Sequence, residues 1–236
     1  MTAAPIILVP GFWLGAWAWD EVAEALRADG HDVTALTLPG LESPDADRSG
    51  VTQSDHVTAI CDAVRAKGRP VVLAVHSGAG YPGYAASDRC TDAIAAMVYV
   101  DTAPGKGAMD PDFTDAEKPL PSPTELAESE NLDGLSEAQL ATFRQRAVPQ
   151  PGGTLREAIE LTNDARLDIP STVICTASTA AEYQEYAKQG MGFLAGLLEV
   201  RNLTYIDLPT SHWPMWSRPA ELAKIIGDVA TAQGDA

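Results

Sequence analysis

The strongest candidate for a reactive side chain is Ser77, which stands between an apolar run and a stretch of very small residues. Residues 71–80 read VVLAVHSGAG. A serine at a sharp turn from a strand into a helix has its hydroxyl exposed, and such a turn tolerates only small neighbours. Gly78 and Gly80 are such neighbours. The pattern predicts a nucleophile at Ser77, with a serine that merely caps the helix as the alternative.

A serine nucleophile needs a neighbouring base, and the chain contains four histidines. His31 follows a glycine at the entrance to a strand and His56 lies within a helix, so we expect structural roles for both. His76 directly precedes the serine, so its side chain should point away from that of Ser77. His212 lies in the loop PTSHWP, just past the last predicted strand. Parallel sheets bind ligands at the carboxyl ends of their strands, so His212 is the expected base.

The third member of such a catalytic set is a carboxylate that accepts the Nδ1 proton of the histidine. Asp101 directly follows an apolar run at residues 94–100, so it should reach the same edge of the sheet. The order Ser77, Asp101, His212 is that of one large class of hydrolases. Asp101 is therefore the expected acid, and the alternative is an aspartate that only caps the turn after the strand.

Two kinds of segment alternate along the chain and would position these residues. Short apolar runs predict buried strands at residues 5–9, 33–36, 70–75, 94–100, 172–175 and 203–208. Helical spacing of apolar residues predicts helices at residues 20–28, 52–67, 180–198 and 219–232. This alternation predicts an α/β fold: one domain over residues 1–236, with a mostly parallel sheet and helices on both faces.

The regular alternation stops between residues 104 and 168. This segment contains helix-like pieces at residues 136–147 and 154–161 and no clear strand. We expect it to form a small helical cap inserted over one edge of the sheet.

Charge and composition narrow the classes of partner. The 236 residues include 33 acidic and 16 basic side chains, and the formal net charge is −17. A field of that sign repels phosphate backbones and anionic membranes, and no apolar run approaches the roughly 20 residues that cross a bilayer. We expect neither nucleic acid nor membrane as a partner. The acidic excess is greatest between Asp110 and Asp133, where a solvated face is expected rather than a cation site.

The remaining composition favours a protein without bound cofactors. Cys61, Cys90 and Cys175 are widely spaced and odd in number, so buried thiols are expected rather than disulfides or a zinc site. The sequence contains no phosphate-binding loop and no dinucleotide motif, so we expect no cofactor and no metal. The first ten residues lack the features of an export signal, and we expect a cytoplasmic location. The sequence does not distinguish a monomer from a homodimer.

Over nearly its whole length, the chain resembles the α/β-hydrolase superfamily. Within that superfamily it is most similar to the small esterase and hydroxynitrile-lyase branch, and it resembles a serine hydrolase of bacterial type. Residues 9–19, VPGFWLGAWAW, are similar to the H-G-x-x-x-G-A-W-x-W signature of that branch, and LTLPG at residues 36–40 is similar to its D-L-P-G turn. The resemblance implies that the backbone N–H groups of Phe12 and Gly78 form an oxyanion hole. It also implies that Gly11 lets the backbone approach the substrate.

The sequence departs from the pattern of that family at three places. Pro10 replaces the histidine that usually precedes the glycine, and valine and alanine stand at the two glycine positions of G-x-S-x-G. The family usually carries its acid after the penultimate strand, where residues 175–180, CTASTA, contain no carboxylate. The acid has therefore moved to Asp101, or Glu182 reaches back from the next helix. We prefer Asp101, because it lies at a strand end.

The same comparison indicates the reaction. Hydroxynitrile lyases of the branch carry threonine at the position of Gly11 and lysine at the position of Trp213, so the chain favours ester cleavage. Trp13, Trp213 and Met215 are placed to line an apolar substrate pocket. We expect a serine hydrolase that cleaves a small to medium apolar carboxylic ester or lactone through an acyl-enzyme on Ser77. The alternatives are a lyase, cyclase or cofactor-free oxygenase of the same fold, or a ligand-binding receptor without turnover.

Overall fold

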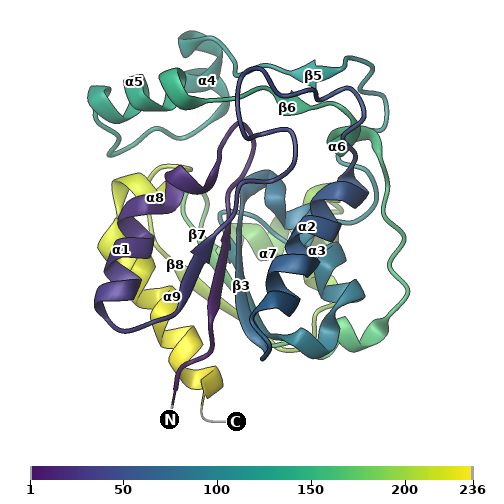
Figure 1. Ribbon diagram of the computed structural model, residues 1–236, viewed down its shortest axis with the longest axis vertical. Helices are drawn as coiled ribbons and strands as arrows, with labels where there is room; N and C mark the ends of the chain where they lie inside the picture. The colour runs from purple at the N-terminus through teal and green to yellow at the C-terminus, as the bar shows by residue number, and fades with distance from the viewer. Residues whose placement is uncertain (1, 235–236) are drawn as a thin grey trace.

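The computed structural model describes residues 2–234 and has a six-stranded sheet between two layers of helices (Figure 1). Residues 1, 235 and 236, which the predicted domain includes, lie outside the described range. The strands are β1 (Ile6–Val9), β2 (Val33–Ala35), β3 (Val71–His76), β4 (Ile94–Val100), β7 (Ser171–Cys175) and β8 (Leu203–Asp207). They pair in parallel in the order β2-β1-β3-β4-β7-β8, which confirms the predicted sheet.

Helices cover both faces of the sheet, so the central strands are buried on both sides. One face carries α1 (Asp20–Ala28), α8 (Pro214–Ser217) and α9 (Pro219–Gly234), and the other carries α2 (Gln53–Ala66), α3 (Gly80–Arg89) and α7 (Ala180–Lys188). Successive residues of a strand point to opposite faces, so Ile6 and Leu8 enter one apolar core while Ile7 and Val9 enter the other. This double burial explains why the central strands β1, β3 and β4 are almost continuous apolar runs, whereas the edge strand β8 is only partly buried.

Short 3₁₀ helices connect several of these elements: η1 (Ala16–Trp19), η2 (Ser77–Ala79), η3 (Thr91–Ala93), η4 (Asp164–Asp168) and η5 (Gly192–Leu198). The helix expected at residues 180–198 is in fact two pieces, α7 and η5. Gly190, with φ of 85°, takes the left-handed conformation that ends a helix and separates them.

Residues 104–168 contain α4 (Pro123–Ser129), α5 (Glu137–Arg146), α6 (Gly153–Arg156) and a two-stranded antiparallel pair, β5 (Glu117–Lys118) with β6 (Gln150–Pro151). The expectation of no strand was wrong, because two-residue strands are too short to show an alternating pattern. The helix expected at residues 154–161 is also shorter, since Ile159 pairs with Gly107 in an extended bridge. In Figure 1, α4, α5 and the β5–β6 pair stand at the end of the sheet opposite the chain termini. We propose that they form the cap.

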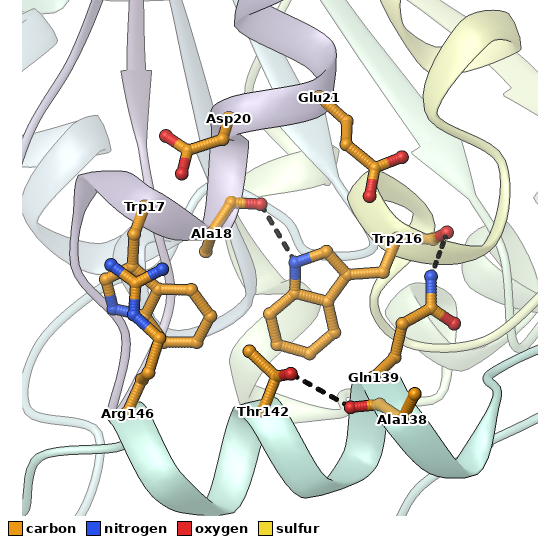
Figure 2. A pocket seen from close by; sticks show the side chains of 9 residues that line it. All are labelled: Trp17, Ala18, Asp20, Glu21, Ala138, Gln139, Thr142, Arg146 and Trp216. Carbon is orange, nitrogen blue, oxygen red and sulfur yellow. Dashed lines mark hydrogen bonds between the residues drawn. The ribbon is translucent and has the colours of Figure 1, made fainter.

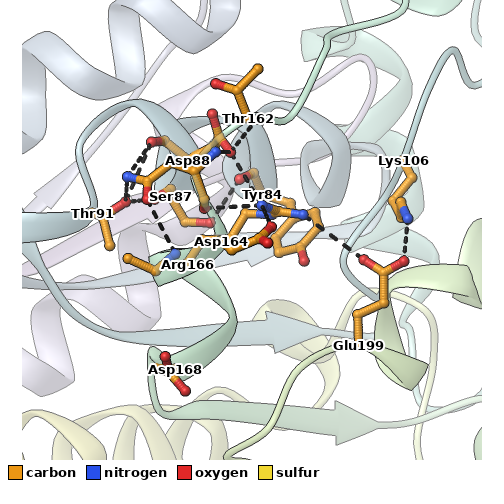
Figure 3. Close-up of polar contacts among 12 residues, drawn as sticks. Tyr84, Ser87, Asp88, Thr91, Lys106, Thr162, Asp164, Arg166, Asp168 and Glu199 are labelled. Carbon is orange, nitrogen blue, oxygen red and sulfur yellow. Dashed lines mark hydrogen bonds and ion pairs between the residues drawn. The ribbon is translucent and has the colours of Figure 1, made fainter.

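A buried ion pair joins the end of this segment to α3 (Figure 3). Arg166 of η4 lies 3.4 Å from the Asp88 carboxylate, and the two side chains are 5% and 7% exposed. The same carboxylate accepts hydrogen bonds from the backbone N–H groups of Thr162 and Asn163 at 2.9 and 2.8 Å. The Arg166 guanidinium also lies over the Tyr84 ring, 5.3 Å from its centroid. Breaking such a buried pair leaves an uncompensated charge, so these contacts fix where the chain returns to the sheet.

The three cysteines are buried and free, which confirms the expectation from their spacing. Within residues 2–234, no helix combines the length and the apolar character needed to cross a membrane.

Candidate active site

Ser77 occupies a strained turn at the carboxyl end of β3. Its φ is 51°, in the left-handed region that residues other than glycine rarely adopt. The turn needs its small neighbours, because a Cβ atom at Gly78 would lie 2.5 Å from the Phe12 ring. A Cβ atom at Gly11 would lie 2.7 Å from that of Ser77. The missing G-x-S-x-G string therefore does not prevent the sharp turn.

His212 lies between Ser77 and Asp101 and contacts both. Its Nε2 is 2.8 Å from Ser77 Oγ, and its Nδ1 is 2.6 Å from Asp101 Oδ2. With Nδ1 donating its proton to the carboxylate, Nε2 is free to accept the proton of the serine hydroxyl. We call these three residues the candidate triad.

The pKa values in the candidate triad follow from these contacts. Burial by itself lowers the pKa of His212, but the hydrogen bond and charge of Asp101, with a smaller contribution from Glu130, raise it above its ordinary value. Burial by itself raises the pKa of Asp101, but the hydrogen bond and charge of His212 lower it overall. The pair thus favours an ionised aspartate and a more basic histidine.

The second oxygen of Asp101 is held by the loop that follows β7. Oδ1 accepts hydrogen bonds from the backbone N–H groups of Thr176 and Ala177 at 3.1 and 3.4 Å, and from the Tyr183 hydroxyl at 3.3 Å. No pattern in the sequence indicated these donors. In the family that the sequence resembles, the acid usually stands in this loop. Here the loop instead orients Asp101, which follows β4.

The alternative acid, Glu182, serves another purpose. Its Oε2 accepts hydrogen bonds from the backbone N–H and the hydroxyl of Thr179 at 2.7 and 2.9 Å, and so closes the capping box that begins α7. Within residues 2–234, the carboxylates within 4.0 Å of a ring nitrogen of His212 are those of Asp101 and Glu130. Glu130 was not anticipated, because it lies in the acidic run that was expected to be a solvated face.

His76 supports the histidine loop from the core. Its side chain is buried, and its Nε2 donates a hydrogen bond to the backbone oxygen of His212 at 2.7 Å. Burial, together with the neighbouring His212, lowers the pKa of His76 to about 3. His56 is also buried, and its Nε2 lies 2.9 Å from the backbone oxygen of Pro39. Both contacts are structural, in keeping with the expected roles.

A narrow pocket lies next to the turn that follows Ser77. Its lining includes Gly11, Phe12 and Gly78 from the two loops after β1 and β3, together with Leu38 and Gln150. The pocket has a volume of about 10 Å³, which is room for about one water molecule. Phe12 and Gly78, the two residues proposed as oxyanion donors, therefore line a small space, and its lining includes no member of the candidate triad.

Trp213 and Met215, which were expected to line a substrate pocket, lie in the core instead. Trp213 and Met215 are 2% and 0% exposed. Trp213 packs against Phe143 of α5, with the centroids of the two rings 5.1 Å apart. The Trp213 ring also stands edge-on to the ring of His212 at 4.9 Å. Trp13 donates its indole N–H to the backbone of β5. Of the four predicted pocket residues, Gly11 lines this pocket, whereas the three larger ones hold the histidine loop and the cap in place.

Residues 6–225 match the protein family described as the alpha/beta hydrolase family. The chain belongs to the alpha/beta hydrolase family. This confirms the resemblance and the fold that the sequence predicted.

Known proteins similar to this alpha/beta hydrolase include two plant esterases and one bacterial hydrolase. Esterase PIR7B from Oryza sativa subsp. japonica is 39% identical over 102 residues, which span 41% of this chain and 38% of that protein. Methylesterase 7 from Arabidopsis thaliana is 26% identical over 95% of each chain. The solved structure of an extracellular alpha/beta-hydrolase from a Paenibacillus species has a TM-score of 0.76 and 21% identity, over 96% of this chain and 99% of that one.

This alpha/beta hydrolase has a second pocket, of about 260 Å³, between α5 and the start of α1 (Figure 2). The rings of Trp17 and Trp216 stack there with centroids 5.7 Å apart, and the Arg146 guanidinium lies 4.4 Å from the centroid of Trp17. Gln139 of α5 donates a hydrogen bond to the backbone oxygen of Trp216. The lining includes no member of the candidate triad, and these contacts join α5 to the segment that follows His212.

Proposed function

We propose that the protein is a serine esterase that cleaves a small to medium apolar carboxylic ester or lactone through an acyl-enzyme on Ser77. The observation that carries this proposal is the continuous contact from Ser77 Oγ through His212 to Asp101, at 2.8 and 2.6 Å, with the serine on a strained turn. The similarity to proteins named as esterases supports it.

The first half of the reaction forms the acyl-enzyme. Ser77 Oγ attacks the carbonyl carbon while His212 Nε2 accepts the hydroxyl proton. The negative charge that develops on the carbonyl oxygen is stabilised by the backbone N–H groups of Phe12 and Gly78. Asp101 stabilises the imidazolium that has formed. The tetrahedral intermediate collapses, and His212 gives its proton to the departing alcohol.

The second half of the reaction restores the enzyme. Water enters in place of the alcohol, and His212 accepts one of its protons as the oxygen attacks the acyl carbon. Collapse of the second intermediate breaks the bond to Ser77 Oγ, which recovers its proton from His212. The products are one carboxylic acid and one alcohol, or one hydroxy acid from a lactone. No group outside the candidate triad and the two backbone donors needs to take part.

Two features indicate the substrate class. The pocket lined by the two proposed oxyanion donors, Phe12 and Gly78, is narrow and mostly apolar, and the net charge of −17 repels anions, so we expect uncharged esters rather than anionic ones. One similar protein is named a methylesterase, so methyl esters are the first substrates to test. A small-molecule substrate is thus the proposed partner, and the cytoplasmic location stays a prediction.

The proposal is tested by measuring hydrolysis of methyl and p-nitrophenyl esters and of lactones by the unchanged protein and by Ser77→Ala. We expect turnover to fall to the background rate in Ser77→Ala while circular dichroism stays unchanged. Ser49→Ala is the matched control, because Ser49 is exposed and bonds only to the nearby Asp47. Turnover that survives in Ser77→Ala would refute the proposal.

A further inference from the structure

Glu130 places a second carboxylate beside the candidate base. It follows α4 at its C-terminal end, and its Oε2 lies 3.9 Å from His212 Nδ1. The same nitrogen donates its hydrogen bond to Asp101 at 2.6 Å. The Glu130 side chain is 32% exposed, so it is partly shielded from water. The imidazole therefore faces one carboxylate in a hydrogen bond and another within ion-pair distance.

Hydrogen bonds of the next residue, Asn131, join the end of α4 to the histidine loop. The backbone oxygen of Asn131 accepts a hydrogen bond from the backbone N–H of His212 at 2.8 Å. The Asn131 side chain donates to the backbone oxygen of Thr210 at 3.2 Å. Two hydrogen bonds thus join the end of α4 to the loop that carries the base. These bonds hold the backbone of Glu130 beside the histidine loop.

Charged and titratable groups from several elements surround the pair. His212 faces Asp101 after β4, Glu130 after α4 and the ring of His76 at the end of β3, with centroids 4.9 Å apart. The pKa of Glu130 is raised overall by burial and by the charge of Asp101, although His212 and Lys118 of β5 act to lower it. A positive charge on His212 therefore favours the ionised form of Glu130, and an ionised Glu130 favours the imidazolium in return.

We propose that Glu130 is a positioning residue that strengthens His212 as a base and makes this strength depend on the contact between α4 and the histidine loop. The effect of Glu130 on catalysis rests on the proposed function, because the His212 imidazolium forms during the reaction only if His212 accepts the Ser77 proton. Asp101 fixes the orientation of the ring through its hydrogen bond. Glu130 adds a second negative charge, supplied by the cap.

The direct test is a pH titration of His212 by NMR of the imidazole nitrogens in the unchanged protein, Glu130→Gln and Glu128→Gln. Removing one charge about 4 Å from the ring should lower the His212 pKa by about one unit in Glu130→Gln. Glu128 is exposed on α4, so Glu128→Gln removes the same charge without this contact and should leave the pKa unchanged. An unchanged His212 pKa in Glu130→Gln would overturn the inference.

The pH dependence of kcat/KM for an ester gives a second readout. Because the reaction needs neutral His212, a lower pKa should move the acid limb of the profile to lower pH by about one unit in Glu130→Gln. Glu130→Asp should recover part of the shift. A uniform loss of kcat/KM at every pH would contradict the inference, since it indicates a structural role alone. Absence of activity in the unchanged protein would count against the proposed function, and the titration would still decide the role of Glu130.

Discussion

Replacing Asp101 with asparagine changes one atom of the candidate triad and removes its negative charge. Oδ1 of Asp101 accepts three hydrogen bonds, from Thr176, Ala177 and Tyr183. The amide oxygen of the variant must therefore keep this position, and its NH₂ group must face His212. Nδ1 of His212 then has to accept a hydrogen bond, which puts the ring proton on Nε2.

The size of the effect follows from this change of tautomer. An imidazole that carries its proton on Nε2 cannot accept the hydroxyl proton of Ser77, and no carboxylate remains in hydrogen-bond contact to stabilise an imidazolium. The equivalent aspartate-to-asparagine change in serine proteases lowers kcat by about 10⁴. We expect a loss of similar size, about 5 kcal/mol of transition-state stabilisation.

The assay compares kcat/KM for one ester in the unchanged protein, Asp101→Asn and Glu182→Gln, with unfolding curves to show that each variant folds. Glu182→Gln removes the charge but keeps an amide oxygen that can accept the hydrogen bonds from Thr179, so its activity should stay within about a factor of two and its stability should fall by less than about 1 kcal/mol. A loss of less than tenfold in Asp101→Asn, or a larger loss in Glu182→Gln, would refute the assignment of the acid.

Three further changes test other contacts. Gly78→Ala places a Cβ atom 2.5 Å from the Phe12 ring and should lower kcat/KM by about 10² through displacement of an oxyanion donor, whereas unchanged kinetics would contradict this. Asp88→Ala removes the buried carboxylate beside Arg166, which keeps its contacts to the more exposed Asp164 and Glu199, and should lower the free energy of unfolding, measured with urea, by about 3 kcal/mol; a loss under about 1 kcal/mol would show that the pair is not structural. Burial lowers the folded-state pKa of His76 to about 3, so its contribution to stability is present above pH 6.5 and is lost as the pH falls, by about 3 kcal/mol at pH 4.5. His76→Gln should flatten that decline in urea unfolding between pH 6.5 and 4.5, and an unchanged slope would rule out this origin.

The sheet and the meeting point of the three triad residues could be predicted because both depend on short-range patterns. Strands buried on both faces leave continuous apolar runs, as at residues 71–76, and parallel strands bring their carboxyl ends to one edge. Ser77 and Asp101 each follow such a strand directly, and the loop of His212 follows the edge strand β8. The capping box of Thr179 and Glu182 was also readable as a T-x-x-E pattern, and it would have excluded Glu182 as the acid.

The cap and its contacts could not be predicted because long-range packing decides them. Glu130 is one of several acids in the run from Asp110 to Asp133, and nothing in the local sequence distinguishes it from the exposed ones. Its burial depends on hydrogen bonds between the end of α4 and residues about 80 positions further along the chain. Trp213 likewise lies in the core because α5 brings Phe143 against it, in a cluster of buried residues that also includes Met215.

The most direct test of the central claim is the mass of the intact protein after incubation with a fluorophosphonate, followed by peptide mapping of any adduct. An activated serine reacts with this reagent, whereas ordinary surface serines do not. We expect a single adduct on Ser77 in the unchanged protein and no adduct in His212→Ala. A folded protein that gains no adduct, or an adduct on a residue other than Ser77, would contradict the assignment of Ser77 as the nucleophile.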